Sequence, residues 1–431
     1  MVFALQSVNF LDKVVIGLVA VPMMAELNLT PVQFGIVGGS VFWLFSVGGV
    51  LGGFLSNRVP SRLILIGMAL LWSLAQIPVA VTSSLIVLVV ARAILGFGEG
   101  PSAAVGMHAM YKWFPDDKRN LPSALSNAGS AFGVIIAGLT IPLITAHWGW
   151  RANFWVLAIA GFVWVAIWWL VGAEGPLDNT TPDKKSGTAG IESAARESAL
   201  ASERAPYRKL LMDPTILCVF LMHFAAYWMV AIALTWVPAY LEKGWGFSAH
   251  QSGRLFALMV VISTLITFLV VGFSQRRLKR GASSRSGRVL VACFAMLASG
   301  LLFASLKFIP YTSTQAIVVF MIANGFSIAL FSFGPVLVSE VVPPAQRGAV
   351  LGIEFAVFGS LPGIIAPLVM GVLLEGGGNP LSEYNAGFAW SGLLLMAAGV
   401  VCLLLMHPER SQARLRDAVE PVAGAGAQAA D

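Results

Sequence analysis

Long apolar stretches separated by short polar ones dominate the sequence. A helix needs about 20 apolar residues to cross the roughly 30 Å hydrocarbon core of a bilayer. The chain contains twelve stretches of about this length, so the pattern predicts an all-α membrane protein with twelve transmembrane helices. We expect these spans at residues 2–24, 31–55, 63–82, 85–111, 121–144, 150–172, 214–241, 250–274, 289–308, 312–338, 348–374 and 384–407.

The longest polar stretch divides the predicted spans into two groups of six. It is rich in Ser, Ala, Glu, Lys and Arg and lacks hydrophobic periodicity, which is typical of a linker. We therefore expect a six-helix bundle at 1–172, a linker at 173–213, a second six-helix bundle at 214–407 and a polar tail at 408–431. The first span begins without a polar lead-in, which leaves open a start codon further upstream.

The positions of the basic residues predict the orientation in the membrane. Of the 27 Lys and Arg, 21 fall on the side that holds both termini and the linker, three on the opposite side and three inside spans. Because basic loops stay in the cytoplasm, we expect a bacterial inner (cytoplasmic) membrane protein with both termini cytoplasmic. These loops account for the net charge of +6, so a lipid bilayer, and no nucleic acid, is the expected partner.

Enzymatic and metal-binding motifs are missing from the sequence. The three cysteines, Cys218, Cys293 and Cys402, lie inside apolar runs, and none is paired with His at a metal-ligand spacing. The chain has no phosphate-binding Gly-x-x-x-x-Gly-Lys-Ser/Thr loop and no His-Glu-x-x-His pair. We therefore expect no metal, no cofactor and no enzymatic activity.

Corresponding motifs occur in the two predicted halves. The junction of spans two and three carries Gly53, Arg58 and Arg62, and the equivalent junction of the second half carries Arg276, Arg277, Lys279 and Arg280. Pro115 precedes Arg119 by four residues, as Pro343 precedes Arg347. Such internal repeats are how many secondary transporters build a site near the membrane midplane.

The junction of spans two and three resembles the loop signature of the major facilitator superfamily, Gly-x-x-x-Asp-Arg-x-Gly-x-Arg. Gly53, Arg58 and Arg62 match it, whereas Asn57 and Pro60 replace its Asp and second Gly. The resemblance implies the major facilitator fold, with two pseudo-symmetric six-helix halves, and makes Gly53, Arg58 and Arg62 a gating loop with a weakened charge latch.

Within that superfamily, the first half resembles the anion:cation symporter family, which includes sugar-acid and aromatic-acid permeases, sialin and vesicular glutamate transporters. The resemblance implies that a small organic anion and protons are the partners. The usual Asp-Arg of span one is Asp12-Lys13 here, and Ser130 stands where galactonate-type members place an amide. The resembling stretches are residues 9–13, 92–101, 108–115 and 149–154.

Charged residues inside the spans are the strongest candidates for function, since each costs about 2.5–3.5 kcal/mol on insertion scales. We assign Lys13 and Arg92 to binding the substrate carboxylate and Asp12 and Glu99 to proton coupling. Arg92 and Glu99 lie seven residues apart, on one face of span four, and the resemblance implies that the acid is released from the arginine when it takes a proton. The alternative is that both pairs are static and only neutralise charge.

Other candidates extend the predicted site. Glu354 in span eleven is a further proton-coupling candidate. His108 matches a histidine of sialin-like members, although a lone His at a helix end is more often structural. The remaining candidates for substrate binding are Ser130, Tyr227 and Asn324.

These residues and the resemblance together predict a monomeric secondary transporter that moves a small organic carboxylate together with protons by alternating access, driven by the proton gradient. Import, as the direction of transport, is what the resemblance implies. A uniporter or exchanger of organic anions stays open, as does a drug or cation:proton antiporter of the same fold. The cations Lys13 and Arg92 argue against the antiporter. Aromatic carboxylates, sugar acids and short hydroxy or dicarboxylic acids all remain candidate substrates, and Lys13 and Ser130 favour a less hydroxylated anion.

Overall fold

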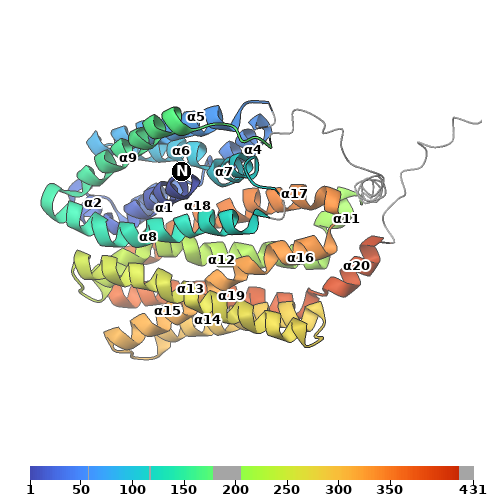
Figure 1. Cartoon of the computed structure of the whole chain (residues 1–431). Coiled ribbons are helices and arrows are strands. Elements are labelled where there is room, and N and C mark those ends of the chain that lie inside the picture. Colours follow the sequence, from blue (N-terminus) through green and yellow to red (C-terminus); the bar gives the residue numbers. More distant parts are fainter. Residues whose placement is uncertain (57, 116–117, 178–204, 417–431) are drawn as a thin grey trace, which may run out of the picture.

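The computed structural model describes residues 1–56, 58–115, 118–177 and 205–416, and the regular elements in these ranges are all helices (Figure 1). Asn57 and the predicted linker and tail residues 178–204 and 417–431 lie outside the described part. The first half comprises α1 (Val2–Leu18), α2 (Ala20–Leu27), α3 (Pro31–Ser40), α4 (Phe45–Leu55), α5 (Ser61–Val81), α6 (Leu85–Glu99), α7 (Ser102–Tyr111), α8 (Asn120–Trp148) and α9 (Trp150–Val171).

The second half follows the short helix α11 (Tyr207–Leu211) and has the same alternating arrangement of spans. Its elements are α12 (Pro214–Ala239), η2 (Tyr240–Gly244), α13 (Ala249–Lys279), η3 (Arg285–Val289), α14 (Leu290–Phe308), α15 (Ser313–Ala329), η4 (Leu330–Ser332), α16 (Gly334–Val341), α17 (Pro344–Ile353), η5 (Glu354–Gly359), α18 (Ser360–Leu373), η6 (Leu374–Gly376), α19 (Pro380–Leu405) and α20 (Pro408–Arg416). Helix α20 occupies the start of the predicted polar tail.

The predicted number of spans is confirmed. Eleven helical segments of the described chain are long and apolar enough to cross a membrane, and α1 with α2, bent by 55°, makes the twelfth if the pair is one span. The bend at Val19 was not expected from the sequence. The first span also extends to Leu27, beyond the predicted end at residue 24.

Sequence signals at the ends of the spans explain where several helices begin. Thr30, Ser248 and Thr312 each cap a helix through a capping box with the Gln three residues later, at the starts of α3, α13 and α15. Asp213 caps α12, accepting hydrogen bonds from the backbone N–H groups of Thr215 and Ile216. These caps satisfy backbone donors that the first turn of a helix leaves unpaired.

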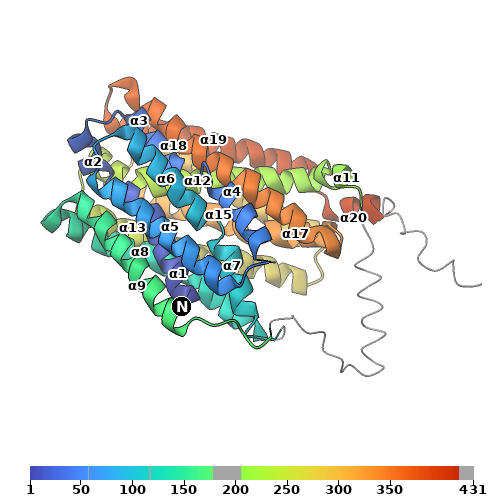
Figure 2. The same ribbon diagram turned by 90° about the horizontal axis from the view of Figure 1, so that it is seen from above.

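The two ends of the bundle differ in which elements they carry. Helices α11 and α20 lie at one end, here called the linker end, and α2 lies at the opposite, far end (Figure 1). Figure 2 shows α3 of the second span beside α18 of the eleventh, so helices of the two halves pack against each other here. Odd-numbered spans run from the linker end to the far end, and even-numbered spans return.

The halves approach each other closely toward the far end. A Cβ on Gly17 of α1 would lie 2.1 Å from the carbonyl oxygen of Leu234 in α12, so only glycine fits there. The Trp236 ring of α12 packs edge-on against Phe34 of α3, with ring centroids 5.0 Å apart, and the Val32 N–H donates to Glu375 Oε1 at 3.4 Å. A small residue such as Gly17 lets membrane helices pack backbone to backbone.

At the linker end, a carboxylate in each half holds the start of a span. Glu174 accepts the Arg62 N–H at 2.8 Å and pairs with Lys112 Nζ at 2.6 Å. Glu409 likewise accepts the Arg285 N–H at 2.9 Å. The ion pairs found among the described residues all join partners within one half: Lys13–Glu99, Lys112–Glu174, Arg151–Glu26, His223–Glu354, Arg288–Glu340 and Arg414–Asp213.

Candidate functional site

Four of the predicted charged residues lie together inside the first half. Helix α1 carries Asp12 and Lys13, and α6 carries Arg92 and Glu99. Their exposed fractions are 0% for Asp12, 8% for Lys13, 1% for Arg92 and 0% for Glu99. All four are thus removed from solvent together. Because two are acids and two are bases, the formal charge of the group is zero. We call these four residues the N-half charge cluster.

Lys13 occupies the middle of this cluster. Its Nζ lies 3.7 Å from Glu99 Oε2 and donates to Asn9 Oδ1 at 2.5 Å. The same nitrogen lies 4.7 Å from the ring centroids of Phe10 and Phe45, within the range of a cation–π contact. Lys13 keeps the largest exposed fraction of the four charged residues.

The partner of Glu99 differs from the one expected. The resemblance implied that Glu99 would pair with Arg92, but the ion pair of Glu99 is with Lys13 of α1. Seven residues separate Arg92 from Glu99 by about 10 Å along the axis, whereas the packing of α1 beside α6 brings Lys13 within reach. Lys13 is therefore the cation that contacts Glu99 directly.

Arg92 instead connects two spans. Its Nε donates to the Val37 carbonyl of α3 at 3.1 Å, while its Nη2 has no hydrogen-bond partner among the described residues. A buried guanidinium with an unused donor is costly unless something accepts it. Because its planar fork matches a carboxylate, Arg92 is suited to binding an organic acid.

Asp12 is the least satisfied member of the cluster. Neither carboxylate oxygen has a geometrically acceptable hydrogen bond within the described chain. The charges that act on it are those of Glu99, Arg92 and Lys13, and the side chain of Gln76 in α5 is its polar neighbour. An uncompensated carboxylate in an apolar interior tends to take up a proton, which is the property that a coupling residue needs.

A second buried group of polar residues lies in the other half. Glu354 begins the π-helical segment η5, and its Oε1 pairs with His223 Nδ1 of α12. Nε2 of the histidine lies 3.4 Å from the Leu330 carbonyl. Both side chains are almost fully buried, and π-helical turns are frequent at functional sites. We call His223 and Glu354 the C-half pair.

The sequence reading missed His223, and also Asn9 and Gln76. The available signal was the occurrence of a titratable or amide side chain in an otherwise apolar span. His223 stands four residues before Tyr227, on the same face of α12. The Tyr227 ring packs edge-on against Phe331, with centroids 4.7 Å apart, and Tyr227 interacts electrostatically with Glu354. Tyr227 therefore belongs with the C-half pair.

The other predicted residues are more dispersed. Asn324 Nδ2 donates to Ser263 Oγ at 2.8 Å, a contact that joins α15 to α13. Ser130 is half-buried on α8, and His108 is exposed on α7. Of the gating loop, Arg62 is held by Glu174 and donates to the Trp169 carbonyl, whereas Arg58 is exposed. The structure therefore concentrates the buried charges in the N-half charge cluster and the C-half pair.

A hydroxyl contact links the surroundings of the two groups. Ser46 Oγ of α4 donates to the Ala356 carbonyl of η5 at 2.5 Å and also makes a hydrogen bond with Ser360 Oγ. Ser46 follows Phe45, whose ring faces Lys13, and Ala356 lies two residues after Glu354. A movement of one half against the other would therefore change contacts near both the N-half charge cluster and the C-half pair.

Twelve apolar spans in two halves, with ionisable groups buried between them, define a multi-pass membrane transporter. The sequence model of the Major Facilitator Superfamily matches residues 2–285. The chain belongs to this superfamily, as the loop signature predicted, and it is therefore a transporter and not an enzyme.

Curated relatives of the chain include proteins named as anion transporters. A probable galactarate/D-glucarate transporter of Escherichia coli is 25% identical over 424 residues, which cover 94% of this chain and 93% of that protein. A probable sulfoacetate transporter of Cupriavidus necator is 26% identical and covers 93% of this chain and 91% of its own length. A probable chloroplastic anion transporter of Oryza sativa is 24% identical over 85% of this chain, which spans only 62% of that longer protein.

Solved structures confirm the fold. A bacterial homologue of the lysosomal transporter Spinster, in an inward-facing conformation, superposes with a TM-score of 0.75 at 18% identity, and the match covers 97% of each chain. A D-xylose–proton symporter superposes with a TM-score of 0.71 at 19% identity, over 95% of this chain and 98% of that one.

Proposed function

We propose that the protein is a proton-coupled symporter that imports a small organic carboxylate across a bacterial inner membrane by alternating access. The observation that carries this proposal is the N-half charge cluster, in which two cations and two acids are buried together and Arg92 keeps an unused donor. The relatives named for galactarate, D-glucarate and sulfoacetate support an anionic substrate.

The contacts of Lys13 provide a route from anion binding to proton uptake. A carboxylate that binds Lys13 and Arg92 competes with Glu99 for the Lys13 ammonium. Once released, Glu99 is left beside Asp12 with less positive charge nearby, and two buried carboxylates close together cannot both stay ionised. Taking up a proton removes this penalty, so the substrate and the proton bind more strongly together than either does alone.

The reverse order follows from the same contacts. When the site opens to the cytoplasm and the anion leaves, Lys13 is free to re-form its ion pair with Glu99, which favours release of the proton. By linkage, the anion and the proton must each raise the affinity of the other by the same factor. The proton gradient therefore drives uptake without any cofactor.

The contacts between the halves support a state that is closed at the far end. Gly17 against Leu234, Phe34 on Trp236 and Val32 on Glu375 all lie toward that end. With both termini and the linker in the cytoplasm, as the basic residues predict, the far end is periplasmic. Both buried groups belong to one chain, so we expect the monomer to be the working unit.

Proton movement in liposomes tests the proposal. Purified protein is reconstituted with a lumenal pH dye, and aromatic acids, sugar acids and short dicarboxylic acids are added one at a time. We expect lumenal acidification with at least one acid, and its loss in Asp12→Asn and Glu99→Gln. Glu26→Gln, the same change at an exposed residue of the far end, is the control and should retain the signal.

Two results would overturn the proposal in different ways. Uptake of a radiolabelled anion with no proton movement identifies a uniporter or exchanger. Acidification that persists in Asp12→Asn and Glu99→Gln reduces these acids to structural ions. Proton export on addition of an organic cation would instead favour the antiporter reading, against which Lys13 and Arg92 argue.

A further inference from the structure

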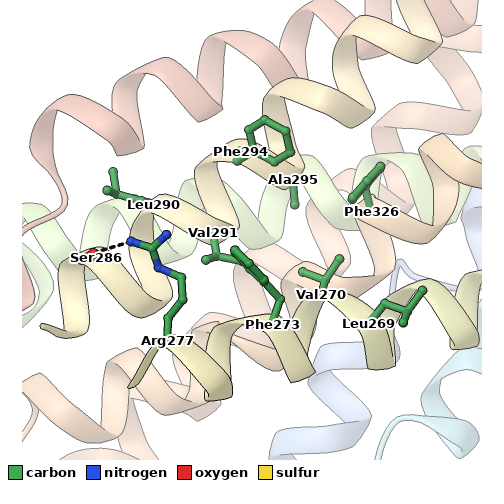
Figure 3. A pocket seen from close by; sticks show the side chains of 10 residues that line it. All are labelled: Leu269, Val270, Phe273, Arg277, Ser286, Leu290, Val291, Phe294, Ala295 and Phe326. Carbon is green, nitrogen blue, oxygen red and sulfur yellow. Dashed lines mark hydrogen bonds between the residues drawn. The ribbon is translucent and has the colours of Figure 1, made fainter. Parts of the chain in front are cut away.

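A groove of about 480 Å³ lies in the second half, away from both buried polar groups. It runs between α13 and the η3–α14 segment, and Phe326 of α15 lines it as well (Figure 3). Leu269, Phe294 and Phe273 line the groove and are 72%, 67% and 53% exposed. Large apolar side chains this exposed on a spanning helix face the hydrocarbon, so the groove opens sideways into the bilayer.

Among the described residues that line the groove, Arg277 is the one that carries a charge. Its Nη2 donates to Ser286 Oγ at 2.9 Å, and its guanidinium lies 5.8 Å from the centroid of the Phe273 ring (Figure 3). Arg277 stands two residues before Lys279, where α13 ends at the linker end. The groove thus combines an apolar channel with one cation at its linker end.

The basic residues around this mouth lack acidic partners. Arg276, Arg277, Lys279 and Arg280 are all exposed, and none of them forms an ion pair with a described residue. The neighbouring arginines differ, because Arg288 pairs with Glu340 and Arg285 lies against Glu409. Four exposed cations that have no ion-pair partner in the described part of the chain therefore lie at the linker end of α13, where phospholipid headgroups lie.

We propose that this groove is a binding site for an anionic phospholipid, with an acyl chain between α13 and α14 and the phosphate on Arg277. A hydrocarbon tail gains little by moving from one apolar environment to another, so the groove contributes dispersion contacts along the chain. Selectivity comes from the headgroup, because the Arg277 fork matches a phosphate and basic pockets on the cytoplasmic side of a membrane protein attract anionic lipids.

Native mass spectrometry of the purified full-length protein tests this site. Phosphatidylglycerol and phosphatidylcholine with identical chains are titrated separately, so that only the headgroup charge differs. We expect one phosphatidylglycerol to be retained in preference to phosphatidylcholine. Arg277→Gln should weaken its apparent affinity about five-fold, the effect of one basic side chain near an anionic surface. Arg410→Gln, an exposed linker-end residue outside the groove, is the matched control and should leave the affinity unchanged.

A second variant tests the apolar part of the site. Val270→Trp fills the groove without changing charge, and should abolish preferential retention while the melting temperature of the protein stays within the range of the controls. Equal retention of the two lipids overturns the proposal. So does an equal loss in Arg277→Gln and Arg410→Gln. Displacement of the lipid by glycerol phosphate, which has no acyl chain, at concentrations comparable to the lipid also overturns it, because the groove would then contribute nothing.

Discussion

The packing of the halves at the far end makes Gly253→Ala an informative perturbation. Gly253 of α13 faces Gly138 of α8, in the opposite half. A Cβ on Gly253 would lie 2.1 Å from the Gly138 carbonyl oxygen and 2.6 Å from Cγ of Pro142. One methyl group therefore cannot be accommodated while the two helices keep this distance, and a backbone carbonyl cannot rotate away as a side chain does.

The size of the effect follows from that overlap. Ordinary contacts of a Cβ fall between 3.4 and 4 Å, so α8 and α13 have to separate by about 1 Å, and overpacking of this kind costs about 1–3 kcal/mol. The cost applies only to the state closed at the far end, because opening separates the two halves. A differential free energy of about 1–3 kcal/mol shifts an equilibrium about 5- to 150-fold, here toward the open state.

Cysteine labelling measures that shift. Thr235 is buried, and its Cγ2 lies against Gly38 across the contact between the halves. We expect Thr235→Cys to react with a hydrophilic maleimide only when the far end is open. While the open state is a small fraction, the labelling rate in Gly253→Ala should rise in proportion to it, about 5- to 150-fold. The three native cysteines are buried, and labelling of the chain without Thr235→Cys gives the background.

Gly272→Ala is the matched control for this experiment. It makes the same substitution on the same helix, but a Cβ there would meet no heavy atom within 4 Å. Its labelling rate should equal that of the parent chain. Equal rates in Gly253→Ala and Gly272→Ala, with both proteins folded, would refute the reasoning that the far-end contact limits opening.

Two stability predictions follow from other contacts. His223→Ala leaves Glu354 buried without its partner, which should lower the free energy of unfolding by about 3–5 kcal/mol. The thermal unfolding midpoint in detergent should therefore be lower for His223→Ala than for the double variant that also carries Glu354→Gln. A midpoint for His223→Ala that is no lower than that of the double variant would contradict the pairing. Asp213→Ala removes the cap of α12, whose oxygen accepts the N–H groups of Thr215 and Ile216, and should cost about 1 kcal/mol. Asp213→Asn should recover most of that loss in the same assay, and an equal loss in both variants would argue against capping.

The fold was largely predictable because the bilayer fixes the length of every span. The predicted spans 31–55 and 85–111 coincide with the observed helical segments Pro31–Leu55 and Leu85–Tyr111. The bend between α1 and α2 was missed although the sequence carries a signal for it. Pro22 has no N–H to donate to the Leu18 carbonyl four residues earlier, and its ring crowds that carbonyl, so the helix breaks at Val19.

The identities of the buried charges were also readable from the sequence, but their partners were not. Each charged residue stands out because placing a charge inside an apolar span is costly, so such residues are rare. Pairing depends instead on which helices cross, so Glu99 meets Lys13 of α1 and not Arg92 of its own helix. His223 was missed for the same reason. A single histidine in an apolar span gains meaning only when Glu354, far along the chain, is found beside it.

Each ion pair between described residues lies within one half. This affects how the equilibrium between the states open and closed at the far end responds to its surroundings. The halves meet through backbone carbonyls, hydroxyls, aromatic rings and glycine contacts, with the Glu375 hydrogen bond to Val32 as a charged contribution. Added salt weakens exposed charge pairs, but here rocking breaks none of them. We therefore expect ionic strength to change turnover little, whereas pressure, bilayer thickness and other factors that act on packing volume should change it strongly.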